Sequence, residues 1–173
     1  MCVYHAKTMN NEAAPSIGPI ALFGSGETSP AAQKIHHQVM SLLEPPVRAA
    51  IVETPAGFEL NSQMVAQRVA DYLTHRLQNF APRTELVPAR ARGTPYSPDD
   101  PVCAAPIFRA NYLFMGPGSP TYAVRQLRNS YTWHSLLAQH RLGAALCFSS
   151  AATIAVSKHA MPVYEIYKVG EDL

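Results

Sequence analysis

The chain has 173 residues, of which 47% are hydrophobic and 15% charged, and its formal net charge is +2. This balance is typical of one globular domain that is long enough to bury a sizeable core. The sequence contains no Lys/Arg block and no apolar stretch of about 18 residues, so it gives no reason to expect nucleic-acid binding, membrane-surface binding or a membrane span.

The cysteines and the N-terminal residues suggest a cellular compartment. Cys2, Cys103 and Cys147 are an odd number at wide spacing, which argues against a disulfide framework, and no CxxC pair indicates zinc. Residues 1–17 lack the continuous apolar region of a secretory signal and are expected to form a flexible lead-in. We therefore expect a reduced, cytoplasmic protein that carries no metal and no cofactor.

Short apolar runs alternate with segments of helical periodicity along the rest of the chain. The apolar runs predict strands at 19–24, 48–55, 84–89, 110–116 and 143–149. Between and after them, the periodicity and the serine–proline caps predict helices at 30–44, 60–79, from 120, at 132–141 and at 151–159. Residues 90–109 are expected to be a loop with one short helix, and 161–169 an extended segment.

Strands that alternate with helices predict a three-layer α/β/α sandwich with a mainly parallel sheet. The strands show no polar alternation, as expected for strands that are buried on both faces. Ligands of such sheets bind beyond the carboxyl ends of the strands. This rule selects four segments as candidate site regions: 24–30, 54–58, 116–120 and 148–153.

Two serines, Ser149 and Ser150, follow the last apolar run and are followed by small residues. A sharp strand-to-helix turn of this kind is typical of a nucleophile elbow, with Ser150 as the nucleophile. The backbone N–H of Ala151 would then be one donor of an oxyanion hole. The alternative is that Ser149 and Ser150 only cap the helix that begins at about 151.

Three stretches carry a resemblance to a known family: GPIALFGSGETSP, YLFMGPGSPTYAVRQLR and ALCFSSAATIAVSKHAMPVYEIYKVGEDL. Together they resemble the cyanophycinase and dipeptidase E family of serine peptidases. The resemblance implies a class I glutamine amidotransferase-like fold over residues 18–173, and it implies that the C-terminal part of that fold is missing from this chain.

The resemblance also implies roles for particular residues. Ser150 and Ala151 match the family's elbow, whereas Phe148 and Ala152 stand where the family has glycines. GPGSP (116–120) resembles the family's Gly-Gly motif, which makes the Gly118 N–H the second oxyanion donor; the alternative is a plain turn. GSGE (24–27) resembles the glycine-rich first loop, which makes Gly24, Gly26 and Glu27 candidate substrate-binding residues.

A serine nucleophile needs a base, and the base needs an orienting acid. Glu165 lies in a stretch like the family's acidic segment, and its alternative is a solvated carboxylate on an edge strand. Glu171 and Asp172 are weaker alternatives for the acid. The family's histidine lies further downstream, and none follows His159 here; a helix would hold His159 about 13 Å from the elbow, as a helix C-terminal residue.

Three functions stay open. The first is a serine peptidase-like hydrolase of short peptides or isopeptides, for which Arg125 and Arg128 are either cations near the substrate or solvated helix residues. The second is a non-catalytic relative, or a fragment, with a small-molecule pocket. The third, a glutamine amidotransferase, would need a cysteine at the elbow, and Cys147 comes three residues too early. Self-association into a homo-oligomer is also open.

Overall fold

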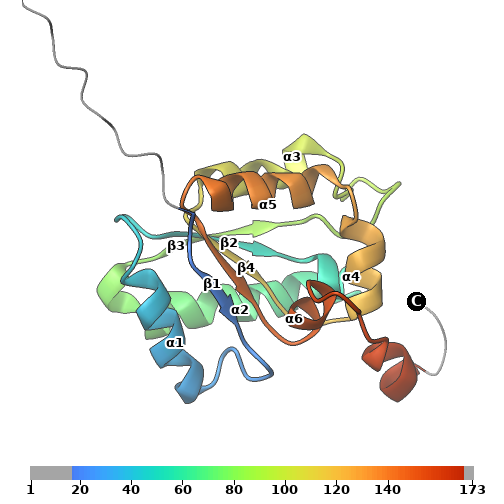
Figure 1. The fold of residues 1–173 in the computed structure, drawn as a ribbon, viewed down its shortest axis with the longest axis horizontal. Helices are drawn as coiled ribbons and strands as arrows, with labels where there is room; N and C mark the ends of the chain where they lie inside the picture. Colours follow the sequence, from blue (N-terminus) through green and yellow to red (C-terminus); the bar gives the residue numbers. More distant parts are fainter. Residues whose placement is uncertain (1–16, 170–173) are drawn as a thin grey trace, which may run out of the picture.

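The computed structural model describes residues 17–169, and its centre is one five-stranded sheet (Figure 1). All strand pairs are parallel and the order is β1-β5-β4-β2-β3. The strands are β1 (Ile20–Leu22), β2 (Arg48–Val52), β3 (Arg83–Val87), β4 (Tyr112–Met115) and β5 (Ala145–Phe148). Each of them overlaps a predicted strand, and the predicted parallel sheet is confirmed.

Helices cover both faces of the sheet, which confirms the three-layer sandwich (Figure 1). One face packs against α1 (Pro30–Met40) and α2 (Ser62–Arg76), and the other against α3 (Pro101–Ala104), η3 (Ala105–Arg109) and α5 (Tyr131–Arg141). The short helices α4 (Pro120–Leu127) and α6 (Ala151–Ala155) follow the ends of β4 and β5. The remaining turns are η1 (Thr54–Ala56), η2 (Gln78–Phe80) and η4 (Glu165–Val169).

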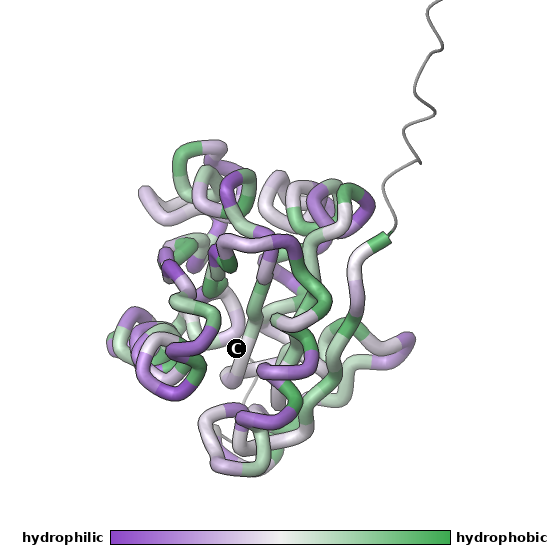
Figure 2. Tube along the Cα trace, turned by 90° about the vertical axis from the view of Figure 1, so that its left-hand side faces the viewer, coloured by the Kyte–Doolittle hydropathy of each residue, from purple (hydrophilic) through white to green (hydrophobic). Residues whose placement is uncertain are grey.

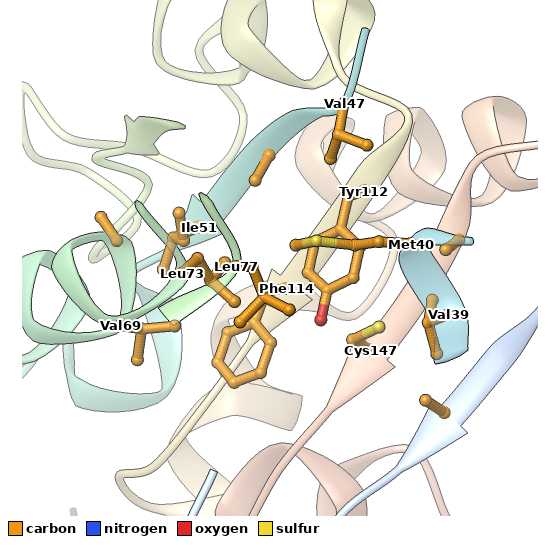
Figure 3. Close-up of a cluster of buried hydrophobic side chains, with 14 of the residues drawn as sticks. Val39, Met40, Val47, Ile51, Val69, Leu73, Leu77, Tyr112, Phe114 and Cys147 are labelled. Carbon is orange, nitrogen blue, oxygen red and sulfur yellow. The ribbon is translucent and has the colours of Figure 1, made fainter. Parts of the chain in front are cut away.

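Alternate residues of the central strand β4 serve the two layers of core. Tyr112 and Phe114 lie in the cluster that faces α1 and α2, whereas Leu113 and Met115 lie in the opposite cluster. All four are at most 2% exposed, and burying each such side chain contributes roughly 1.5–3 kcal/mol. Figure 3 shows the first cluster, in which the Tyr112 hydroxyl points toward Cys147.

Cys147 is a core residue, as the sequence predicted. It is completely buried. Burial raises the pKa of its thiol to about 12, with the Tyr112 hydroxyl acting in the opposite direction. A thiol that stays protonated is a poor nucleophile, so the structure gives no support to the glutamine amidotransferase alternative.

The last part of the chain differs from the prediction. Helix α6 ends at Ala155 and not near 159, because the Ser157 hydroxyl donates to the Ile154 carbonyl over 2.7 Å and competes with the helical pattern. Residues 161–169 are not extended either: they end in the helical turn η4, whose first residue is the buried Glu165. Glu165 therefore does not lie on an edge strand.

The hydropathy of the chain follows the layers. Figure 2 shows hydrophobic stretches along the strands and hydrophilic positions on the outer turns of the helices. Within residues 17–169, no helix combines the length and the apolar character that crossing a membrane would require.

Candidate active site

The strands β1, β2, β4 and β5 end at the same edge of the sheet. Phe148 of β5 pairs in register with Leu22 and Met115, and Met115 pairs with Val52. The loops that follow these strands are the four segments that the sequence selected, so the structure brings them to one side of the molecule.

Ser150 lies at the turn between β5 and α6, on this edge. Its backbone has φ +49° and ψ −117°, a conformation that costs a non-glycine residue of order 1–3 kcal/mol. The Ser150 N–H donates to the Gly24 carbonyl over 2.6 Å, and the Ser149 N–H donates to the Met115 carbonyl over 3.0 Å. The turn is therefore held between the ends of β1 and β4.

The backbone of Ser150 differs from that of the serines that cap helices in this chain. Ser29, Ser119 and Ser130 have φ of −80°, −100° and −81°, and each hydroxyl accepts a hydrogen bond from a backbone N–H of the first turn. The Ser150 hydroxyl makes no such bond to α6. Capping by its side chain therefore does not account for Ser150, which lies at a sharp turn between β5 and α6.

The residues after Ser150 are small because α6 begins in close contact with its surroundings. Ala151 and Ala152 are 2% and 0% exposed. The Ala152 N–H lies 3.0 Å from the Ser149 carbonyl and 3.3 Å from the Gly116 carbonyl. A larger side chain at either alanine would displace the helix from the sheet.

The loop between β4 and α4 presses against η1. Gly118 has φ +145°, and a Cβ atom there would lie 1.9 Å from the Pro55 carbonyl oxygen, so only glycine fits. The next residue, Ser119, donates its N–H to the same carbonyl over 2.9 Å and caps α4. Ser119, as the cap of α4, fixes the loop that presents Gly118. The loop is therefore a turn before a helix, and this does not conflict with a role for Gly118 in the site.

Ser150 and Gly118 line the same cavity, which has a volume of about 390 Å³. The loops 116–120 and 148–153, from which the two oxyanion donors were expected, therefore border the same cavity. The other lining residues come from η1, α2, the α4 loop and the C-terminal segment: Ala56, Glu59, Val65, Arg68, Pro117, Val163, Tyr164, Tyr167 and Lys168. Peptide-sized groups fit a cavity of this size.

Glu165 binds the N-terminal turn of α4. It is 4% exposed, and its Oε1 accepts hydrogen bonds from the hydroxyls of Ser119, over 2.6 Å, and Thr121. Burial raises the pKa of the Glu165 carboxyl, but the two hydroxyls and the nearby Arg125 outweigh burial and hold that pKa below its ordinary value. A carboxylate at a helix N-terminus is also favoured by the helix dipole.

Residues 163–168 form one wall of the cavity, and two contacts besides Glu165 hold them. The Tyr164 hydroxyl donates to Glu59 Oε1 over 2.9 Å, and the Tyr164 ring packs edge-on against Phe58 with centroids 5.0 Å apart. Lys168 Nζ lies 5.8 Å from the centroid of the same ring. The wall carries a cation, and Arg68 adds a second from α2.

The glycine-rich first loop supports the Ser150 turn and does not line the cavity. Gly24 contributes its carbonyl to the Ser150 N–H, and Gly26 has φ +84°, which suits glycine. The Glu27 carbonyl contacts His36 Nε2 over 2.8 Å. Among the described residues, the cavity lining contains none of the three predicted substrate-binding positions of this loop.

No histidine lines the cavity within residues 17–169. His159 is exposed and lies beyond the end of α6, so it is not the helix C-terminal residue that was predicted. His5, Glu171 and Asp172 lie outside the described residues. The two arginines after the Gly118 loop have different surroundings. Arg125 lowers the pKa of the Glu165 carboxyl, whereas Arg128 lines a different pocket, of about 200 Å³, between α4, α5 and α6.

Sequence reasoning missed the residues that form the cavity walls. Val65 of α2 is half-buried and lines the cavity together with Arg68, three residues further along. Helical spacing places these two side chains on one face, which is the signal that could have identified Arg68. Nothing in the sequence pattern points to Glu59 or Tyr164.

The fold resembles two solved structures that are described as peptidases. A peptidase from an acI-B1 Actinobacterium matches with a TM-score of 0.70 and 20% sequence identity, over 85% of this chain and 59% of that one. A candidate peptidase E protein from Listeria monocytogenes EGD-e matches with a TM-score of 0.59 and 9% identity, over 89% of this chain and 68% of that one. No family model matches the chain, and no curated protein matches it significantly.

Sequence identities of 20% and 9% establish a shared fold and nothing about the reaction. The match spans less than two thirds of the actinobacterial peptidase. The chain therefore has a peptidase E-like α/β fold, with a strained serine, a glycine loop and a cavity at the carboxyl edge of its sheet.

Proposed function

We propose that the chain is a serine-type hydrolase of the cyanophycinase and dipeptidase E kind, which acts on peptide or isopeptide bonds. Ser150 is the nucleophile: its hydroxyl oxygen bonds to the substrate carbonyl carbon, the C–N bond breaks, and the amine leaves with the hydroxyl proton. Water then hydrolyses the acyl-serine and restores the Ser150 hydroxyl. The N–H groups of Gly118 and Ala151 bind the oxyanion that forms. A short peptide occupies the cavity, where Arg68 and Lys168 face its anionic groups.

The backbone of Ser150 is the observation that carries this proposal. Ser150 has φ +49°, and its side chain makes no capping hydrogen bond to α6 that would offset the cost of this backbone conformation. The same residue lines the cavity. Strain of this kind concentrates at functional sites. The peptidase descriptions of both structural neighbours support the same class of reaction.

Glu165 has a part in this proposal through the α4 loop. Its carboxylate holds the hydroxyls of Ser119 and Thr121, and Ser119 directly follows Gly118. Glu165 thereby fixes the loop that presents one oxyanion donor. A role as the acid of a triad requires a histidine beside it, whereas within residues 17–169 the side chains that act on the Glu165 carboxylate are Ser119, Thr121 and Arg125.

The test is covalent labelling with a fluorophosphonate, with the modified residue located by mass spectrometry. We expect labelling of Ser150 in the wild-type chain and none in Ser150→Ala. Ser149→Ala is the matched control, because Ser149 is the adjacent serine but is completely buried, and it should label like the wild type. Labelling that persists in Ser150→Ala would refute the assignment of the nucleophile.

The second candidate is a non-catalytic protein that binds a small molecule in the same cavity. The observation in its favour is that no histidine lines the cavity within residues 17–169, because a serine hydroxyl without a base is a weak nucleophile at neutral pH. Absence of labelling, together with saturable binding of an acidic dipeptide by calorimetry, would favour this candidate.

A further inference from the structure

His36 is a buried histidine that the proposed reaction does not use. It lies on α1, is 0% exposed, and stacks on the Phe23 ring with centroids 4.7 Å apart. Both ring nitrogens have partners: Nδ1 lies 2.6 Å from the Tyr112 hydroxyl, and Nε2 lies 2.8 Å from the Glu27 carbonyl oxygen. The ring therefore joins the core to the first loop.

The chemistry of the partners fixes the proton positions. A carbonyl oxygen only accepts hydrogen bonds, so His36 Nε2 carries the proton and donates it to Glu27. In the neutral ring Nδ1 is then an acceptor, and the Tyr112 hydroxyl donates to it. Burial lowers the pKa of His36, while the Glu27 carbonyl and the Glu27 charge raise it. The neutral ring satisfies both contacts at once.

The loop that His36 holds is the loop that holds Ser150. Residues 24–29 connect β1 to α1, and the Gly24 carbonyl at their start accepts the Ser150 N–H. Their far end is fixed by the Tyr72 hydroxyl, which donates to the Ser29 carbonyl over 2.6 Å. His36 is the anchor between these two, at Glu27.

We infer that His36 is a positioning residue for the elbow: it ties the loop 24–29 to the core and so fixes the Gly24 carbonyl that orients the Ser150 backbone. The bond from His36 to the Glu27 carbonyl, which we call the tether, does not depend on the proposed function. Its effect on the reactivity of Ser150 rests on that function. The two parts are therefore tested by different measurements.

The first measurement is residue-resolved amide hydrogen exchange at Ser29 and Ser150, whose N–H groups donate to the loop carbonyls of Gly26 and Gly24. His36→Phe keeps a ring against Phe23 and removes both hydrogen bonds. We expect exchange of the two serine amides, which we call loop exchange, to rise about three- to tenfold, as follows from the loss of one hydrogen bond. His37→Phe is the matched control, because His37 is the next residue but is exposed and packs against Phe80, and it should leave the loop unchanged.

Two further variants separate tethering from stability. His36→Phe removes the Nδ1 acceptor of the buried Tyr112 hydroxyl and leaves the weakly accepting sulfur of Cys147 in its place, and the double change His36→Phe/Tyr112→Phe removes that penalty. The double variant should recover melting temperature but keep fast exchange in the loop. His36→Gln, whose side-chain N–H can reach Glu27, should restore part of the protection. A merely structural role predicts instead that exchange rises equally in β4 and in the loop.

The second measurement is the rate of fluorophosphonate labelling at equal distances below each variant's melting temperature. We expect labelling of His36→Phe and of the double variant to be about tenfold slower than that of the wild type and of His37→Phe. If loop exchange is unchanged in the double variant, the tether is refuted. If loop exchange rises but labelling keeps its wild-type rate, the link to the elbow is refuted. If the wild type itself does not label, the proposed function fails, and loop exchange alone decides the role of His36.

Discussion

Gly118 and Gly93 both have a backbone that disfavours side chains, with φ +145° and +73°, but only Gly118 is crowded. We therefore expect Gly118→Ala to destabilise the fold by about 3 kcal/mol or more, because its Cβ would meet the Pro55 carbonyl. Gly93→Ala, with open space around its Cβ position, should cost about 1 kcal/mol. Urea unfolding of the two variants measures the difference, and equal losses would contradict the close approach of the α4 loop and η1.

The sequence identified Ser150 and Gly118 because the expected role of each depends on the backbone at the end of a strand. Ser150 and Gly118 stand at strand ends, next to residues of recognisable turn chemistry, so their positions followed from order along the chain. Glu59 and Tyr164 reach the cavity through packing of segments that are far apart in the sequence. No local pattern records such packing, so these residues were not found.

Among the elements, the segment 161–169 depends most on a single side chain. Glu165 is its buried anchor, and its contacts hold the pKa of the carboxyl below the ordinary value of 4.5. A carboxyl with a lowered folded-state pKa stabilises the fold above its ordinary value, and this contribution is lost as the pH falls through the lowered value. We expect the segment to loosen only below about pH 4.5.

Limited proteolysis between Met161 and Lys168 at several pH values checks this expectation. The wild type should become sensitive only in acid, whereas Glu165→Ala should be sensitive at neutral pH as well. Glu165→Gln is the matched variant: it keeps an acceptor for the hydroxyls of Ser119 and Thr121 but carries no charge. It should therefore be protected at neutral pH more than Glu165→Ala and lose the acid transition. An acid transition that survives in Glu165→Gln would point to another group.

The inner strands β2, β4 and β5 were predictable because they are apolar runs between turn residues, and their burial on both faces indicates parallel pairing. The edge strands β1 and β3 are exposed on one face, and β3 (RTELV) is not an apolar run, so the expected burial on both faces is wrong for these two. The segment 161–169 was not predictable. Its β-branched and aromatic residues in VYEIYKV are types that favour strands, but the buried bonds to Glu165 from the start of α4 accompany a helical turn. A long-range contact of one carboxylate outweighs the local preference there.

For the whole molecule, we expect slow turnover. The chain assembles a strained serine, two candidate oxyanion donors and a cavity, but within residues 17–169 the cavity lining offers no imidazole to take the serine proton. Sites that lack a triad member typically retain about 10³–10⁴ of rate enhancement over water. Assays of the purified chain with aspartyl dipeptides should show slow turnover that falls further in Ser150→Ala. Robust turnover that vanishes in Ser150→Ala would show that another group serves as the base.

The order of the sheet also determines when the candidate site can exist during synthesis. Strand β1 leaves the ribosome before the other four, yet within residues 17–169 the strand that it pairs with is β5, the last of the five to be made. Until β5 emerges, β1 has no neighbour to pair with, and the Gly24 carbonyl has no Ser150 N–H to accept. Pairing over so long a stretch of chain is slow. A nascent chain that ends before β5 therefore lacks both the Ser150 turn and the wall formed by residues 163–168, so any reactivity of the serine begins only after the sheet closes.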